Sequence, residues 1–225
     1  MLVPRDLARE LAVAVGLLVL VLSSIALTKH LYRVMRKAGL KHNVAVYYNR
    51  KIIHMMAGGV TALLVPYFFT SPLIPFIFAL AIGLAVYIPH KRGRILEWFQ
   101  VSDNMYEVNF CIAWGTSLLV LWLITGNPYI AVLPPLFISF GDAVTGVIRN
   151  AVYGERTKSW IGNIGMLTVT AFLGYLFGKY PGLTAGVIAT LVEHFEIPPL
   201  LDDNLLIVAA SSATLLLFHA TGFAT

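Results

Sequence analysis

The sequence predicts an all-α fold, a polytopic membrane protein with about eight transmembrane helices and a range of seven to nine. Hydrophobic residues make up 58% of the 225 residues and charged residues only 12%. This composition lies outside that of soluble globular domains. The apolar residues also gather in long runs, and no polar stretch between them is long enough for a soluble domain. We therefore expect residues 1–225 to form a single integral membrane domain.

Eight apolar segments follow one another along the chain, at about 11–28, 52–69, 73–89, 108–125, 129–148, 164–178, 182–194 and 205–219. Several approach the roughly 20 residues that cross a hydrocarbon core of about 30 Å, whereas the sixth and seventh are short and leave the helix count open. The first is expected to be retained as a helix, because the cationic cluster follows it and does not precede it. The basic linker 29–51 has apolar residues at helical spacing and predicts a cytoplasmic interfacial helix.

Thirteen of the sixteen lysines and arginines lie in three regions, 29–51, 91–94 and 149–158. With eight helices, all three regions fall on one side, which the positive-inside rule makes cytoplasmic. We thus expect a multi-pass protein of the cell membrane, with both termini outside and its active site on the cytoplasmic side. Anionic lipid head groups or a nucleotide explain these cations better than nucleic acid does. The single cysteine, Cys111, leaves neither a disulfide framework nor a thiolate metal site.

The stretch NRKIIHMMAGG carries the first polar cluster. Arg50, Lys51 and His54 share one helix face at a predicted cytoplasmic helix end. Gly58 and Gly59 continue this helix without bulk, so that another backbone or a lipid chain can approach closely. Arg50 and Lys51 are equally typical of a positive-inside flank, whereas His54 lies a full turn inside the apolar segment.

Glu107 forms the second candidate, at the mouth of the apolar segment 108–125. An ionisable residue that enters the hydrocarbon region is costly and is usually functional. The neighbouring cations at 91–94 are interpreted as topogenic charges only.

The stretch GDAVTGVIRNAVYGERTKS places Asp142 and Arg149 on one helix face, with Gly146 between them. Asp142 is either a functional carboxylate or a structural partner of Arg149. Small residues around Gly58 and Gly146 either frame a slot for a lipid chain or pack helices together. Lys158 and Ser159 follow a polar turn, where a phosphate can meet an ammonium and backbone N–H groups.

The stretch EHFEIPPLLDDNLL holds four carboxylates, Glu193, Glu196, Asp202 and Asp203. Glu196 is typical of an exposed acidic loop. Asp202 and Asp203 precede an apolar segment and either one can cap its helix, but capping requires only one residue.

Carboxylates that face cations at one membrane surface predict a site for Mg²⁺ and a polyphosphate. Mg²⁺ prefers one or two carboxylates together with phosphate oxygens, and phosphoryl transfer requires mainly positioning and charge neutralisation. We expect Asp142, with Asp202 or Asp203, to hold the metal. The predicted phosphate-binding residues are Arg50, Lys51, Arg149, Lys158 and Ser159. The predicted catalytic residues are Asp142, Glu107, His54 and Lys158.

Four motifs resemble, in order and spacing, the signatures of the dolichol kinase and phytol kinase family, integral membrane enzymes that phosphorylate a lipid alcohol. They are RKIIHMMAGG, NMYEVNFCIAWG, GDAVTGVIRNAVYGERTKS and LVEHFEIPPLLDDNL, within roughly residues 50–218. The resemblance implies CTP as phosphoryl donor, a divalent cation such as Mg²⁺, and a dolichol or polyprenol as acceptor among the membrane lipids. The sequence departs from the family pattern after Ser159, where Trp160 stands in place of the usual Glu.

Three other functions stay open at the level of sequence. A lipid cytidylyltransferase, which transfers CMP to a lipid phosphate, would use the same residues. A geranylgeraniol, phytol or diacylglycerol kinase would differ only in its acceptor, and apolar walls discriminate chain length weakly. A small transporter would also place carboxylates in helices, but near the membrane midplane. The sequence predicts no oligomeric state.

Overall fold

The computed structural model describes residues 2–154, 157–195 and 202–222, and its regular elements there are all helices. Seven helical stretches are long and apolar enough to cross a membrane. This confirms the predicted all-α polytopic fold. The elements are α1 (Leu7–Lys37), α2 (His42–Ile53), η1 (His54–Gly59), α3 (Val60–Phe68), α4 (Leu73–Lys91), α5 (Tyr106–Thr125), α6 (Pro128–Ala131), α7 (Leu133–Leu136), η2 (Phe137–Gly141), α8 (Asp142–Tyr153), α9 (Trp160–Glu193) and α10 (Asp203–Ala220).

Several of these elements join into longer rods. α2, the π-helical turn η1 and α3 form one continuous stretch, and α6 to α8 form another through the second π-helical turn, η2. The basic linker 29–51 is the end of α1, a short turn and α2. It is therefore not the single interfacial helix that its periodicity predicts.

α9 reverses direction at Lys179, whose φ of 49° and ψ of −135° are not helical. Its two arms then run antiparallel, since Thr170 Oγ1 donates a hydrogen bond to the carbonyl of Gly186 at 3.0 Å. Gly174 and Gly182 lie so close that a Cβ on either would meet the other's backbone. The two short apolar segments of the sequence correspond to these arms. The arms can approach each other this closely because glycine carries no Cβ.

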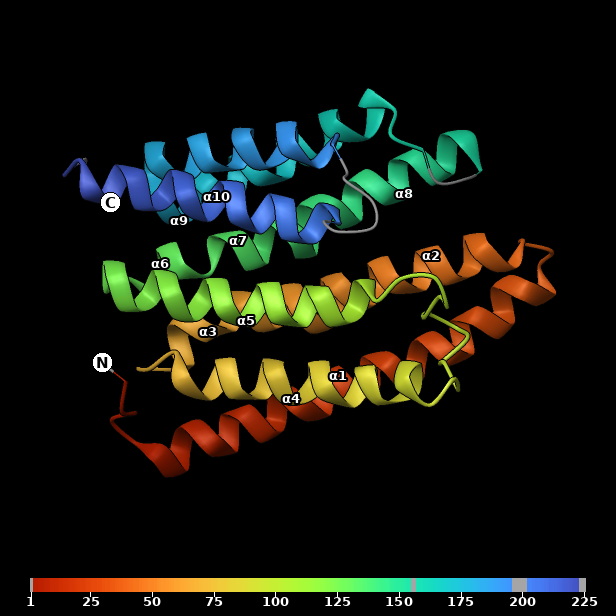
Figure 1. Cartoon of the computed structure of the whole chain (residues 1–225), viewed down its shortest axis with the longest axis horizontal. Coiled ribbons are helices and arrows are strands. Elements are labelled where there is room, and N and C mark those ends of the chain that lie inside the picture. The colour runs from red at the N-terminus through yellow and green to blue at the C-terminus, as the bar shows by residue number, and fades with distance from the viewer. Residues whose placement is uncertain (1, 155–156, 196–201, 223–225) are drawn as a thin grey trace.

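The two termini lie at the same end of the bundle, as Figure 1 shows. The turn between α1 and α2, the connection between α4 and α5, and the C-terminal end of α8 lie at the opposite end. These are the connections that carry the predicted cytoplasmic cations. The cation-rich connections therefore gather at one end of the molecule.

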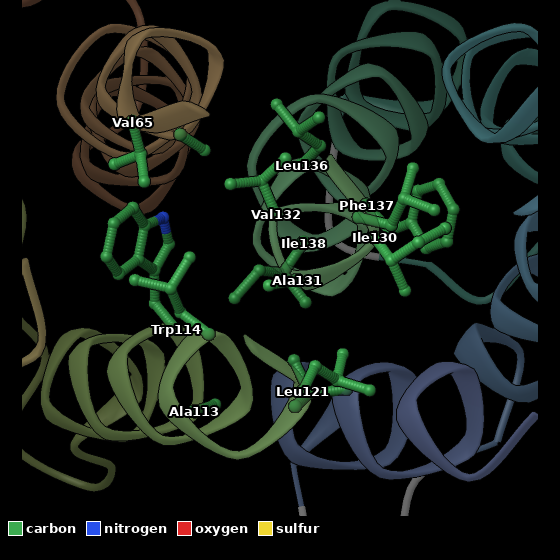
Figure 2. Packing of buried hydrophobic residues seen from close by; sticks show 14 of the residues in the cluster. Val65, Ala113, Trp114, Leu121, Ile130, Ala131, Val132, Leu136, Phe137 and Ile138 are labelled. Atoms are coloured by element: carbon green, nitrogen blue, oxygen red, sulfur yellow. The ribbon is translucent and has the colours of Figure 1, made fainter. Parts of the chain in front are cut away.

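The stretch from α6 to η2 occupies the centre of the bundle. Figure 2 shows Ala131, Val132 and Ile138 of this stretch on the side toward α5, where Trp114 and Leu121 lie. All five side chains are buried. Asp142 follows directly after η2, so the fold carries this carboxylate into the protein interior and away from lipid.

Candidate functional site

A buried ion pair joins the second and fifth of the seven candidate spans. Lys51 Nζ of α2 donates to Asp142 Oδ2 of α8 at 2.6 Å, and both side chains are less than 10% exposed. Gly146 makes this pairing possible, because a Cβ there would collide with the Lys51 stem and the Tyr47 hydroxyl. The structure thus brings together Lys51 and Asp142, which the sequence analysis predicted as phosphate-binding and metal-binding residues, as direct partners of each other.

Three buried carboxylates, one of them that of Asp142, lie close together at this pair. Asp142, Glu193 and Asp203 each place one oxygen within 4.8 Å of the others' oxygens. Lys158 Nζ donates to Glu193 Oε1 and to Asp203 Oδ2, both at 3.2 Å. Three carboxylate oxygens at this separation fit a hard divalent cation such as Mg²⁺. Among the described residues, these three are the group that could hold a metal ion.

Arg149 is fully engaged within the protein. Its Nη1 and Nη2 donate to Glu193 Oε1 and Oε2 at 2.7 and 2.9 Å, and Nη2 also donates to Asn163 Oδ1 at 2.7 Å. Its Nε donates to the carbonyl of Ser159 at 2.8 Å. The bidentate geometry fixes the Glu193 carboxylate. Arg149 therefore positions a carboxylate of the cluster, and its predicted contact with phosphate stays a prediction.

Two further predicted site residues, Ser159 and Asp202, cap helices in the structure. Ser159 caps α9, with Oγ accepting from the backbone N–H of Ile161 and sharing a hydrogen bond with the Tyr153 hydroxyl. Asp202 caps α10 by accepting from the Leu205 N–H, and its other oxygen accepts from Asn109 Nδ2 at 2.9 Å.

Burial raises the pKa of Asp202. Asp202 lies outside the carboxylate cluster, whereas its neighbour Asp203 belongs to it. Glu196 lies outside the described residues.

His54 lies between the cluster and the apolar interior. Its Nδ1 is 3.8 Å from Asp142 Oδ2, too far for a hydrogen bond, and its ring stacks on Phe110 with centroids 4.0 Å apart. Neither ring nitrogen has a hydrogen-bond partner within the described structure. A buried polar group without a partner requires an explanation, and a ligand hydroxyl at this position would supply one.

Glu107 belongs to a polar group that the sequence did not reveal in full. Its Oε1 lies 2.5 Å from His90 Nε2 and accepts from Gln100 Nε2 at 2.7 Å. Its Oε2 has no hydrogen-bond partner in the described chain. His90 stands directly before the cations at 91–94, and a histidine at the end of an apolar segment was the available signal.

An apolar groove runs between α1, α4, α5 and the α2–α3 rod, with a volume of about 100 Å³. His54 and Glu107 line it together with Gly58 and, farther along, Phe69. His54 and Phe69 are fifteen residues apart, which corresponds to roughly 22 Å along the helical rod. The groove is thus narrow, long and polar at one region of its wall.

The three predicted lipid-binding glycines have different environments. Gly58 lines the groove and packs beside Phe110. Gly59 packs against the Phe140 ring, and Gly146 packs against Lys51 and Tyr47. Gly58 therefore keeps the predicted position, whereas Gly59 and Gly146 serve helix packing.

No known protein family, curated protein or solved structure matches this chain.

We predict that Lys51→Met destabilises the protein by about 3–5 kcal/mol, because Asp142 then stays buried without its partner. The measurement is the thermal unfolding midpoint of the purified protein in detergent. The double variant Lys51→Met/Asp142→Asn should recover most of the loss, since it removes both charges of the pair and leaves neither partner unpaired. Lys37→Met, at an exposed position of α1, is the matched control. A single variant as stable as this control would contradict the role of the ion pair.

Proposed function

We propose that this protein is a membrane lipid-alcohol kinase that transfers the γ-phosphoryl group of CTP to a polyisoprenoid alcohol at the cytoplasmic face. One observation carries the proposal. A small pocket holds Lys51, Asp142 and Asp203 and shares His54 with the apolar groove, while sharing Arg50 with a polar cavity. A lipid substrate and a water-soluble substrate can therefore reach the same charged cluster from two sides.

The charges of the cluster suit a polyanion. Asp142, Glu193 and Asp203 are balanced by Lys51, Lys158 and Arg149. Arg50 adds a further buried cation, whose Nη1 has no hydrogen-bond partner among the described residues. A triphosphate would find a positive environment here, and preorganised cations of this kind stabilise charge in a phosphoryl-transfer transition state.

Asp142, Glu193 and Asp203 would hold Mg²⁺, and Arg149 would keep the Glu193 carboxylate in place. The bound metal would neutralise phosphate charge and orient the transferred group. Lys51 and Lys158 each contact a carboxylate of this set. They are therefore close enough to donate to phosphate oxygens that share the metal.

The groove supports a lipid alcohol as the acceptor. Its lining residues extend over roughly 22 Å of the rod, about three quarters of a hydrocarbon core of about 30 Å, and an isoprenoid chain would lie along this direction. The alcohol would meet His54, whose ring nitrogens have no hydrogen-bond partner among the described residues. Glu107 Oε2, in the same groove, likewise has no hydrogen-bond partner in the part of the chain that the structure describes. Either group can orient the hydroxyl, and a loose transition state requires little base strength.

The four motifs that resemble the dolichol kinase and phytol kinase family support CTP and a polyprenol as the substrates. The positive-inside rule supports a cytoplasmic site, because the cation-rich connections gather at one end of the bundle (Figure 1). The same residues would also suit transfer of CMP to a lipid phosphate. That reaction differs from the kinase reaction in which phosphorus of CTP is attacked.

Labelled CTP tests the proposed reaction directly. The purified protein is incubated with Mg²⁺, CTP labelled at the α or the γ phosphate, and a panel of polyprenols, geranylgeraniol, phytol, diacylglycerol and lipid phosphates. We expect radioactivity in the organic phase from γ-labelled CTP alone, on a polyprenol. Label from α-labelled CTP would instead identify a cytidylyltransferase and overturn the kinase assignment.

Adjacent aspartates provide a matched test of the metal site. We predict that Asp203→Asn lowers Mn²⁺ affinity and kinase activity at least about tenfold, because it removes a ligand of the cluster. Asp202→Asn should keep both within about twofold, since asparagine caps a helix as well as aspartate. Metal binding is measured by titration with Mn²⁺, independently of turnover. Equal effects of the two substitutions would refute the assignment of Asp203.

Blocking the groove tests the lipid position. Leu18 lines the groove from α1, whereas the next residue, Val19, does not line it and is 58% exposed. We predict that Leu18→Trp raises the KM for a long polyprenol at least about tenfold, because the added ring takes the space of the chain. The KM for CTP should not change. Val19→Trp is the control, and a similar KM in both variants would place the lipid elsewhere.

A further inference from the structure

A polar cavity of about 760 Å³ adjoins the charged cluster. Its wall is built from α2, from the connection between α4 and α5, and from the C-terminal end of α8. These elements lie together at the end of the bundle opposite the termini (Figure 1). The volume falls within the range of roughly 300–1,000 Å³ that is typical of small-molecule sites.

Asn150 of α8 gives this cavity an unsatisfied hydrogen-bonding group. Its side chain lines the cavity and is only 4% exposed. Neither Nδ2 nor Oδ1 has a hydrogen-bond partner in the described part of the chain. Native structures leave few buried polar groups unpaired. A carboxamide offers donors and an acceptor side by side, so a ligand with an adjacent donor and acceptor would satisfy both atoms.

Arg50 connects the cavity to the carboxylates. Its guanidinium lies 4.4 Å from the Tyr106 ring centroid and 5.6 Å from that of Tyr47. All three residues line both the polar cavity and the small pocket that contains Lys51, Asp142 and Asp203. Arg50 and the two tyrosines therefore lie between the polar cavity and the charged cluster, on a side of the cluster away from the apolar groove.

We propose that this cavity is the nucleoside pocket, in which Asn150 hydrogen-bonds the edge of the base and Arg50 receives the triphosphate as it leaves the cavity. The proposal rests on the proposed function, since it gives the phosphoryl donor a defined position. Nucleobases present neighbouring donors and acceptors on one edge, and proteins read them by hydrogen bonds combined with aromatic contacts. Tyr47 and Tyr106 supply aromatic walls at the exit of the cavity.

The test separates recognition of the base from recognition of the phosphates. Equilibrium binding of CTP and of inorganic tripolyphosphate is measured with the full-length protein in detergent and Mg²⁺. We expect the wild type to bind CTP at least about tenfold more tightly than tripolyphosphate. Asn150→Leu should weaken CTP binding at least about tenfold and leave tripolyphosphate binding unchanged. Unchanged tripolyphosphate binding also shows that the variant is folded.

Two further variants complete the design. Asn150→Asp keeps the size of the side chain but removes its N–H donors, and it should also weaken CTP binding selectively. Asn104→Leu makes the same chemical change as Asn150→Leu in the connection before α5, outside the cavity lining. It should change neither affinity.

The outcomes distinguish this proposal from the proposed function. If Asn150→Leu binds CTP as tightly as the wild type, or if the wild type binds tripolyphosphate as tightly as CTP, the nucleoside pocket is refuted while the kinase activity can still stand. If Asn150→Leu loses affinity for the polyprenol alone, the nucleoside pocket is refuted as well. If the wild type neither binds CTP nor transfers label from it, both proposals fail together.

Discussion

The buried Lys51–Asp142 ion pair is the interaction on which the rest of the site depends. A single charge inside an apolar bundle is costly, and a pair removes most of that cost only while both partners stay in place. The pair ties α2 to α8, while Arg149 and Lys158 tie α8 and the following turn to Glu193 at the end of α9. The same ion pairs therefore neutralise the buried charges and fix the relative positions of these helices.

The positions of the two π-helical turns relate to these ion pairs. η1 begins at His54 and η2 ends at the residue before Asp142. A π-turn inserts an extra residue into a helix and is frequent at functional sites. Here η1 starts at the imidazole and η2 ends beside the carboxylate, so both turns lie next to the charged cluster.

Much of the fold and part of the site follow from the sequence. Long apolar runs predicted the helices, and helical spacing brought Lys51 and His54 to one face. Spacing could not choose between Asp202 and Asp203, because adjacent residues at a helix start point in different directions and only one of them reaches Lys158. Spacing also could not predict that the Arg149 guanidinium donates hydrogen bonds to Glu193 and Asn163, since tertiary packing brings those partners from α9. Glu193 itself lies at the end of a short apolar segment, where a flanking acidic residue is common.

The environments on either side of His54 decide what chemistry the site can support. On one side the groove is apolar for roughly 22 Å, and on the other the small pocket contains Lys51, Asp142 and Asp203. A reaction within one phase would need only one of these environments. A reaction that joins a membrane-dissolved alcohol to a phosphate from water needs both, with the reacting atoms at the boundary. His54 lies at that boundary, and neither of its ring nitrogens has a hydrogen-bond partner within the described structure. The proposed transfer would therefore take place at this boundary.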